Sequence, residues 1–207
     1  MIIIVNYGMG NLGSVHNMLK RAGIDSLITE KPEDVLRASR IILPGVGAFD
    51  QAMDNLKRSG LADALRRRVE QDEVPILGVC LGMQLLTETS EEGNCDGFGW
   101  IPGKTIRFRQ VDLGLDMKIP HMGWNLVSTT QVNPILPLTE EELRFYFVHS
   151  YHVDCAPEYM IGVSNYGYSF ASAIGHRNVL GVQFHPEKSH RFGLDLLSRF
   201  AKAQGGL

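Results

Sequence analysis

Short runs of consecutive apolar residues alternate with amphipathic stretches along the first half of the chain. The apolar run at residues 1–7 is too short for a helix of ordinary length, so it predicts a buried strand, and further strands are predicted at residues 25–30, 40–45 and 74–79. The stretches that follow them carry apolar residues at helical spacing and predict helices at residues 11–23, 32–39, 48–71 (broken at Gly60) and 83–90. This alternation is typical of a parallel sheet covered by helices on both faces.

The second half changes to strand patterns joined by glycine and Asn/Pro turns. It predicts strands at residues 104–110, 124–129, 143–153, 160–167, 170–176 and 178–184, and a closing amphipathic helix at residues 193–203. The sequence contains no repeat, low-complexity tract or linker. We therefore expect one domain over residues 1–207. Its expected class is α/β: a three-layer, flavodoxin-like α/β/α fold with a mixed, mostly parallel central sheet and an added antiparallel region.

Composition narrows the possible function classes. The 207 residues carry a net charge of −3, which gives no positive field for nucleic acid. No stretch approaches the ~18 apolar residues that a membrane helix requires, and the start lacks the basic segment of a signal peptide. The three cysteines include no CxxC pair, which argues against a disulfide framework or a zinc site. We expect a cytoplasmic protein with free thiols, no metal, and no nucleic-acid or membrane partner.

Residues 8–13, "GMGNLG", match the G-x-G-x-x-G fingerprint of dinucleotide-binding folds. The motif follows a predicted strand and opens a predicted helix, and Glu30 lies about 20 residues beyond it, as the fingerprint asks. The second half lacks the further strand–helix units of such a fold, and a lone fingerprint has a high false-positive rate. We therefore favour a tight glycine turn into a helix over a nicotinamide cofactor site.

The stretch "GVCLG" at residues 78–82 copies the nucleophile elbow G-x-S-x-G with sulfur in place of oxygen. A nucleophile at the tip of a sharp strand-to-helix turn needs small flanking residues to avoid clashes. The helix behind it directs N–H groups and its positive end at the sulfur, which favours the thiolate. A buried structural cysteine is the alternative for Cys80, whereas Cys95 and Cys155 lack such a frame and are assigned structural or surface roles.

A cysteine nucleophile needs a base and a group that orients the base. Of the seven histidines, His185 stands out because an apolar strand stops at His185-Pro186-Glu187. The histidine and the glutamate lie two residues apart, so both side chains can point the same way. A carboxylate beside the imidazole fixes its tautomer and supports the imidazolium.

The stretch "ILPGVGAF" at residues 42–49 runs a strand into a loop with two glycines. Such a loop allows close backbone approach and can donate N–H groups to a developing oxyanion. No Gly-Lys-Ser/Thr follows, so the loop is not a phosphate-binding loop of the Walker type. By itself an ordinary strand-to-helix turn would explain it.

Together, "PGVGAF", "GVCLGMQLL" and "GVQFHPEKS" resemble, in this order, the class I glutamine amidotransferases of the triad type. The resemblance covers the whole chain. The further motifs "NYGMGNLGSV", "PHMGWN" and "YFVHSYH" narrow it to the glutaminase subunits of imidazole glycerol phosphate synthase, from histidine biosynthesis. A class I glutamine amidotransferase fold and an enzyme that hydrolyses L-glutamine without a cofactor are what this resemblance implies.

The resemblance also implies roles for individual residues. Cys80 would attack the glutamine amide, His185 would move the protons, and Glu187 would orient His185. The oxyanion would be held by backbone N–H groups at Leu81 and at Val46 or Gly47. The ligands implied for the amino-acid end of glutamine are Gln84, Glu92, His149, Ser150 and Tyr151. A carboxylate for the ammonium and N–H or O–H donors for the carboxylate suit a zwitterionic substrate.

In this family the ammonia passes to a synthase partner, here a cyclase subunit with a (β/α)8 barrel, in a heterodimer. The opening glycine motif resembles a partner-facing loop, and Trp and Met are favoured at interface cores. The implied partner residues are Asn11, His121, Met122, Trp124, Asn125 and Lys188. For Trp124, a half-buried core position is the alternative.

Two departures leave the ammonia acceptor open. His190 stands where a small residue such as glycine is expected, and "GLDMKIP" at residues 114–120 is added ahead of "HMGWN". Both lie beside implied partner contacts, so they bear on partner choice. A paralogue could keep the triad and feed ammonia to another synthase, for instance one that makes an amidino-bearing surface sugar. A cysteine peptidase or γ-glutamyl hydrolase would share the elbow but would not need Gln84 or Glu187.

Overall fold

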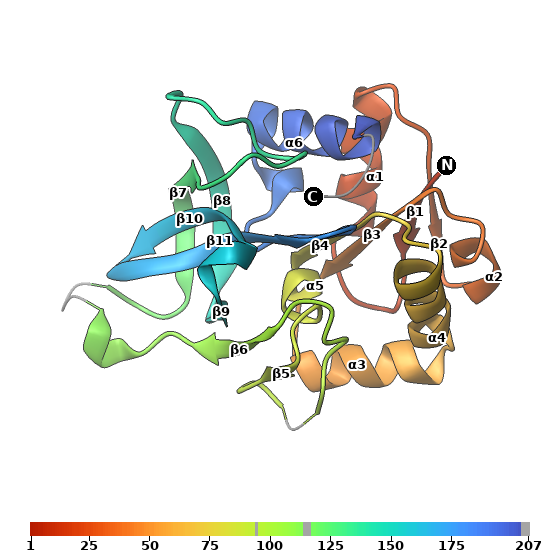
Figure 1. Cartoon of the computed structure of the whole chain (residues 1–207), viewed down its shortest axis with the longest axis horizontal. Helices are drawn as coiled ribbons and strands as arrows, with labels where there is room; N and C mark the ends of the chain where they lie inside the picture. The colour runs from red at the N-terminus through yellow and green to blue at the C-terminus, as the bar shows by residue number, and fades with distance from the viewer. Residues whose placement is uncertain (94, 114–116, 204–207) are drawn as a thin grey trace.

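The computed structural model describes residues 1–93, 95–113 and 117–203. Twelve strands in this part of the chain form one sheet, whose main path runs β2-β1-β3-β4-β12-β11-β10-β7-β8. In Figure 1 the parallel half of the sheet lies between two helical layers, and the antiparallel half extends away from them. This confirms the predicted three-layer α/β/α class with a mixed central sheet.

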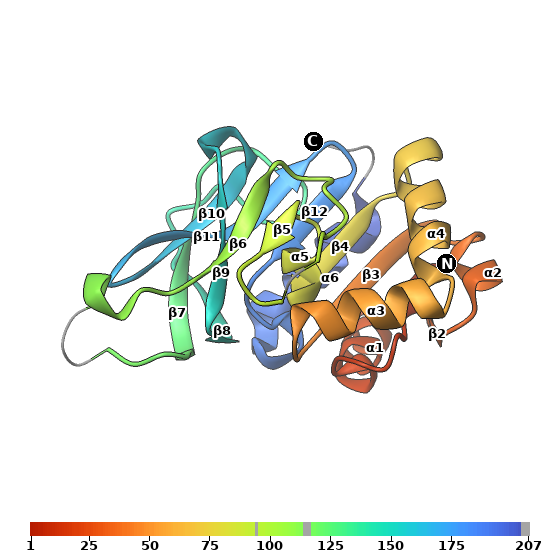
Figure 2. The same ribbon diagram turned by 90° about the horizontal axis from the view of Figure 1, so that it is seen from below.

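The parallel half consists of β1 to β4 and of β12, which returns from the end of the chain to pair with β4. The bounds of these strands are β1 Ile2–Val5, β2 Ser26–Thr29, β3 Arg40–Gly45, β4 Ile76–Cys80 and β12 Val179–Val182. Helices α1 Leu12–Arg21 and α6 His190–Lys202 cover one face, and α3 Phe49–Arg58 and α4 Leu61–Arg66 cover the other (Figures 1 and 2). The short helix α2 Pro32–Val35 follows β2.

Strand β1 shows why this half is stable. All its residues are buried, and they alternate between two cores. Ile3 and Val5 pack in the cluster that includes residues of α3 and α4, whereas Ile2 and Ile4 pack in the cluster that includes residues of α1 and α6. A strand with helices on both faces must be apolar at every position, which is the pattern that predicts it from sequence.

The other half is mostly antiparallel, with β7–β8 and β10–β11 as pairs of consecutive strands and the short β5 paired parallel with β6. Its strands are β5 Thr89–Ser90, β6 Gly103–Arg107, β7 His121–Thr129, β8 Leu143–His149, β9 Tyr151–Cys155, β10 Met160–Tyr166 and β11 Tyr168–His176. Strand β12 pairs with β11 antiparallel and with β4 parallel, so it joins the two halves. The added segment at residues 114–120 precedes β7, and its residues 114–116 lie outside the described residues.

The prediction of a helix at residues 83–90 is wrong. The helix after Cys80, α5, covers Leu81–Gln84, and Thr89–Ser90 form a strand. The carbonyl oxygens of Leu85 and Leu86 accept hydrogen bonds from the backbone of Phe98 and Ile101, so they are not free to continue a helix. The side chain of Thr87 also bonds the Gln84 carbonyl, a local bond that competes with helix formation.

Candidate active site

Cys80 occupies the sharp turn between β4 and α5. Its backbone has φ +55° and ψ −110°, in a region where residues other than glycine are strained. Neither flanking glycine has room for a side chain. A Cβ on Gly78 would lie 2.5 Å from the carbonyl oxygen of Gly82, and a Cβ on Gly82 would collide with the carbonyl oxygen of Leu43. Both glycines are therefore required by the packing of the turn that presents the cysteine.

His185 and Glu187 follow β12, the strand that pairs with the cysteine-bearing β4. The imidazole Nδ1 donates to Oε1 of Glu187 over 2.8 Å, and both side chains are 2% exposed. The carboxylate thus leaves Nε2 free, and this atom has no hydrogen-bond partner of ordinary length in the described residues. Burial lowers the pKa of His185, but the nearby Cys80 and the bonded Glu187 carboxylate outweigh burial and raise it to about 10.

The loop with two glycines lies on the other side of the elbow. Gly45, the last residue of β3, pairs with Cys80 in the parallel ladder. Val46 is 44% exposed, and Gly47 has φ +114°, a conformation that favours glycine. The buried hydroxyl of Tyr7 donates to the carbonyl oxygen of Pro44 over 2.7 Å. Burial raises the pKa of Tyr7, and nearby Cys80 raises it further, so this hydroxyl keeps its proton.

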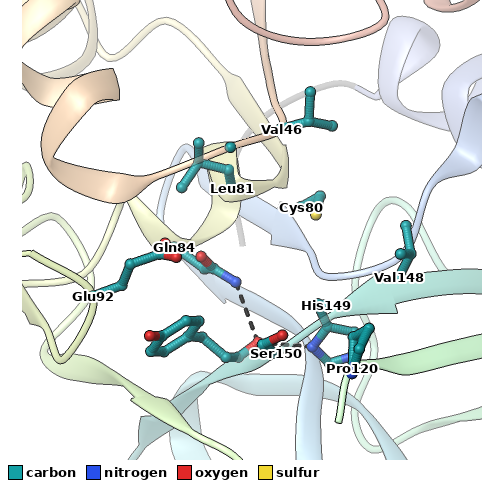
Figure 3. A pocket seen from close by; sticks show the side chains of 11 residues that line it. Val46, Cys80, Leu81, Gln84, Glu92, Pro120, Val148, His149 and Ser150 are labelled. Atoms are coloured by element: carbon teal, nitrogen blue, oxygen red, sulfur yellow. Dashed lines mark hydrogen bonds between the residues drawn. The ribbon is translucent and has the colours of Figure 1, made fainter.

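These strand ends open into one cavity of about 330 Å³ (Figure 3). This volume suits a small-molecule ligand. The cavity brings together Cys80, the three implied oxyanion residues and all five implied substrate residues. Its lining is Val46, Gly47, Cys80, Leu81, Gln84, Glu92, Pro120, Val148, His149, Ser150 and Tyr151. The first four come from the parallel half, and the last five come from the antiparallel half or the segment leading into it.

Two further polar side chains, Gln84 and Glu92, line the cavity between its parallel and antiparallel sides. Gln84 Nε2 donates to the carbonyl oxygen of Tyr151 over 3.2 Å and to Oε1 of Gln183 over 3.1 Å. Glu92 Oε2 accepts from the backbone N–H of Phe49 over 3.2 Å. Burial raises the pKa of Glu92, an effect that the Phe49 N–H opposes and the neighbouring carboxylate of Asp50 reinforces.

Sequence reasoning missed Gln183. This residue is fully buried, and its Nε2 lies 3.7 Å from the Cys80 sulfur while its Oε1 accepts from Gln84. The signal that could have found it is the strand period, because residues 183 and 185 point to the same face of an extended chain. Pro120 and Val148 in the cavity wall were missed as well, and no local signal marks them.

The implied partner residues fall into two groups. Asn11, Met122, Trp124 and Lys188 are exposed. His121 is 3% exposed and Asn125 is only partly exposed, and the two are joined by a hydrogen bond, so their side chains lie behind that surface.

His190 lies beside the exposed tryptophan. Its ring stacks on Trp124 with centroids 5.5 Å apart and planes 8° apart. Its φ is +47°, in the region that glycine adopts most easily, which explains why a small residue was expected there. The Lys188 ammonium lies 5.7 Å from the ring centre of Tyr146 on β8, opposite Trp124, so one cation and several aromatic rings lie on this side.

The fingerprint glycines have different surroundings from those of a dinucleotide site. Gly13 is exposed, and nothing lies within 4 Å of a Cβ placed on it. Gly10 has φ +113°, and a Cβ placed on it would lie 3.3 Å from Pro44. Its lack of a side chain therefore lets this turn pack against the glycine loop beside the elbow. In the described residues no group of three His, Cys, Asp or Glu side chains could hold a metal ion. None of the helices described there is long and apolar enough to cross a membrane.

The chain matches the family model of glutamine amidotransferase class-I over residues 3–203. It therefore belongs to the class I glutamine amidotransferases, as its resemblance predicted, and it is a glutamine amidotransferase enzyme. A solved structure of PurLQS from Thermotoga maritima shares the fold, with a TM-score of 0.71 at 18% identity over 96% of this chain and 94% of that chain.

Curated relatives define a narrower group. The chain is 49% identical to imidazole glycerol phosphate synthase subunit HisH 2 of Methanococcus maripaludis and 48% identical to the protein of the same name of Pseudomonas aeruginosa. Each alignment covers 98% of this chain and 99% of the relative. The chain thus belongs with the HisH subunits, which confirms the narrower resemblance.

Proposed function

We propose that this chain is the glutaminase subunit of an imidazole glycerol phosphate synthase in histidine biosynthesis. It hydrolyses L-glutamine to glutamate and ammonia and passes the ammonia to a cyclase subunit, which makes imidazole glycerol phosphate and AICAR. One observation carries the glutaminase assignment: a cysteine in a strained turn lies near a buried histidine, which follows the neighbouring strand and is held at one nitrogen by a carboxylate. The names of the relatives support the histidine pathway and do not favour the alternative acceptor.

In the proposed reaction the Cys80 sulfur attacks the side-chain amide carbon of glutamine. His185 holds the thiol proton and gives it to the departing ammonia, which leaves a thioester on Cys80. Water then attacks the thioester with His185 as base, and glutamate leaves. Glu187 keeps the proton on Nδ1, so Nε2 is the nitrogen that exchanges protons with the reacting groups.

Backbone N–H groups stabilise the negative charge that develops on the substrate oxygen. We assign this role to Leu81, directly after the nucleophile, and to Val46 or Gly47 on the adjacent strand end, since all three line the same cavity as the sulfur. The positive φ of Gly47 marks a peptide that few other residues could form. A loop of this kind has to present its N–H in the right direction. We therefore expect the isolated chain to be weakly active and to gain much activity when the partner and its ligand bind.

The amino-acid end of glutamine fits the opposite side of the cavity. The Glu92 carboxylate is suited to the substrate ammonium, and Ser150 and Tyr151 offer hydroxyl and N–H donors to the substrate carboxylate. Gln84 and His149 bond the carbonyl oxygen of Tyr151, so they shape this wall.

The cyclase partner, which is a (β/α)8 barrel, docks on the face formed by the outer side of β7 and its surroundings. Met122 is 62% exposed and Trp124 is 48% exposed. They alternate with the buried or partly buried His121 and Asn125, so they lie on the opposite face of the strand. Lys188 adds a charge at the rim, and Asn11 is exposed on the loop after β1. The chain acts as a single glutaminase domain in a cytoplasmic heterodimer.

Complementation tests the pathway. The chain and the (β/α)8 barrel encoded beside its gene are expressed in a strain that lacks its own glutaminase subunit, on medium without histidine. We expect growth with the wild-type chain and none with Cys80→Ala. If the purified pair hydrolyses glutamine but does not restore growth, the ammonia goes to another acceptor. If the pair hydrolyses no glutamine, the glutaminase proposal itself is wrong.

A further inference from the structure

A chain of buried hydrogen bonds runs from β7 to the wall of the glutamine cavity. His121 and His149 are directly opposite each other in the antiparallel ladder of β7 and β8. Their rings meet at Nδ1 of His121 and Nε2 of His149, 2.9 Å apart. Nδ1 of His149 lies 2.7 Å from the carbonyl oxygen of Tyr151, and Nδ2 of Asn125 lies 3.2 Å from Nε2 of His121.

The groups at the two ends of this series of hydrogen bonds fix the direction of every bond in it. The Tyr151 carbonyl can only accept, so His149 carries its proton on Nδ1. At the other end Nδ2 of Asn125 can only donate, so Nε2 of His121 accepts, the proton of His121 lies on Nδ1, and Nε2 of His149 accepts that proton. Both rings are therefore neutral, each in one tautomer, and each depends on the other to keep it.

The surroundings hold both rings in place and keep them uncharged. His121 stacks between Phe147 and Tyr166, with ring centroids 4.8 Å and 4.1 Å away. Phe108 and Phe170 pack against His149, with centroids 5.2 Å and 5.4 Å away. Burial lowers the pKa of His121 to about 4 and lowers that of His149 well below its usual range.

The series of hydrogen bonds continues beyond the cavity wall toward the sulfur of Cys80. The same Tyr151 carbonyl accepts from Gln84, Gln84 donates to Gln183, and the Gln183 amide lies 3.7 Å from the Cys80 sulfur. At the other end, His121 belongs to the strand whose opposite face exposes Met122 and Trp124. The network thus links the strand that carries the proposed partner face to the proposed substrate segment, through four side chains and the backbone carbonyl of Tyr151.

We propose that His121 is a positioning residue for glutamine binding, which acts through His149 by holding the Ser150–Tyr151 segment in the shape that receives the amino-acid end of the substrate. The inference rests on the proposed function. Without the donor at His121, His149 can place its proton on Nε2, and its bond to the Tyr151 carbonyl is then lost. The cavity wall loosens while the triad keeps its own contacts, so substrate affinity falls more than turnover.

Three variants test this in the complex with the barrel partner and its ligand. His121→Phe keeps an aromatic ring between Phe147 and Tyr166 but removes the donor, and we expect KM for glutamine to rise about tenfold with kcat within about threefold. His121→Asn keeps an N–H near the position of Nδ1, and KM should return to within about threefold of the wild-type value. His152→Phe is the matched control.

His152 is 4% exposed in the same aromatic cluster and bonds Tyr168 instead of the cavity wall. Its substitution by Phe also removes a buried ring nitrogen, so a purely structural effect would act on both variants alike. KM should stay at the wild-type value in His152→Phe. An equal rise in the two Phe variants, or no rise in His121→Phe, overturns the proposal.

A second measurement does not depend on catalysis. In the free chain, ¹⁵N spectra of the histidine rings should show Nδ1 protonated and Nε2 bare in both His121 and His149. A proton on Nε2 of His149 in the wild-type protein overturns the inference, even where the kinetics agree. A wild-type complex that hydrolyses no glutamine would instead count against the proposed function, so the two failures are distinguishable.

Discussion

The parallel and antiparallel halves of the sheet contribute to the candidate site in different ways. In the parallel half, Cys80, the glycine loop and His185 all follow strands that lie side by side, so the end of each strand fixes the place of its residue. In the antiparallel half, the cavity wall depends on pairs such as His121 and His149, which the strand register brings together. The first half thus provides the proposed reacting groups, and the second half shapes the space around them and carries the proposed partner face.

Removal of the nucleophile is the strongest test of the claim that the parallel half provides the reacting groups. Cys80→Ala should lower glutamine hydrolysis by at least about a thousandfold, because the thioester can no longer form. Cys155→Ala, a cysteine of the antiparallel half whose pKa burial raises to about 12, should keep the wild-type rate. An alkylating glutamine analogue followed by peptide mapping should label Cys80 alone. A label on Cys95 or Cys155 would overturn the assignment.

The second largest expected effect is on stability, and it also concerns the turn at Cys80. Gly82→Ala should lower the free energy of unfolding by about 3 kcal/mol, since its Cβ would collide with the backbone carbonyl of Leu43 in the central strand β3. Urea unfolding followed by fluorescence measures the change. Wild-type stability in this variant would mean that the turn has room for a side chain and that the glycine pattern has another cause.

How far the sequence predicts the site follows from this contrast. The elbow, the glycine loop and the His-Pro-Glu motif are each written in a few consecutive residues, because a turn and its clashes are local. Gln183 was missed although it stands two positions before His185, since its role depends on Gln84, which belongs to a different element. The His121–His149 bond was missed because it depends on the register of β7 and β8, which a single sequence does not specify.

The fold shows the same limit. Apolar runs predict the buried strands of the parallel half well, because burial on both faces leaves a continuous pattern. The helix expected at residues 83–90 ends at Gln84 instead, because backbone groups from residues 98–101 take the carbonyl oxygens that the helix would use. Helical spacing cannot reveal such a distant competitor.

A third prediction tests whether the antiparallel half carries the face that binds the partner. Trp124→Ala should weaken binding of the barrel partner by about tenfold to a hundredfold, because a large exposed aromatic near the centre of an interface is typical of a hot spot. Val132→Ala serves as the control. Val132 is 82% exposed, but it follows the C-terminal end of β7, whereas the cavity lies near the N-terminal end of that strand. Isothermal titration calorimetry measures both. Equal affinities for Trp124→Ala and the wild type would place the docking face elsewhere.

Acid should affect the antiparallel half through its buried histidines. The pKa of His121 is about 4 in the folded protein against about 6.5 when unfolded, so the unfolded chain binds more protons between these values. The stability that this ring contributes is present above pH 6.5 and is lost as the pH falls toward 4, an effect of about 2 kcal/mol. Urea unfolding from pH 7 to 4.5 should show a shallower decline in His121→Phe. Parallel curves for the variant and the wild type would mean that the ring is not buried as a neutral group.

The smallest effect separates the glycine turn from the dinucleotide fingerprint that it imitates. In a dinucleotide site the third glycine allows helix and strand to pack closely, so a methyl group there would be harmful. Here Gly13 lies on the exposed side of α1 with nothing within 4 Å of its Cβ position. Gly13→Ala should therefore raise stability by about 0.5 kcal/mol through helix propensity and leave glutamine hydrolysis unchanged. Gly10→Ala, at φ +113° against Pro44, should lower both stability and activity. If Gly13→Ala is the more harmful of the two, the first turn of α1 packs as it does in a dinucleotide site, and our interpretation of this motif is wrong.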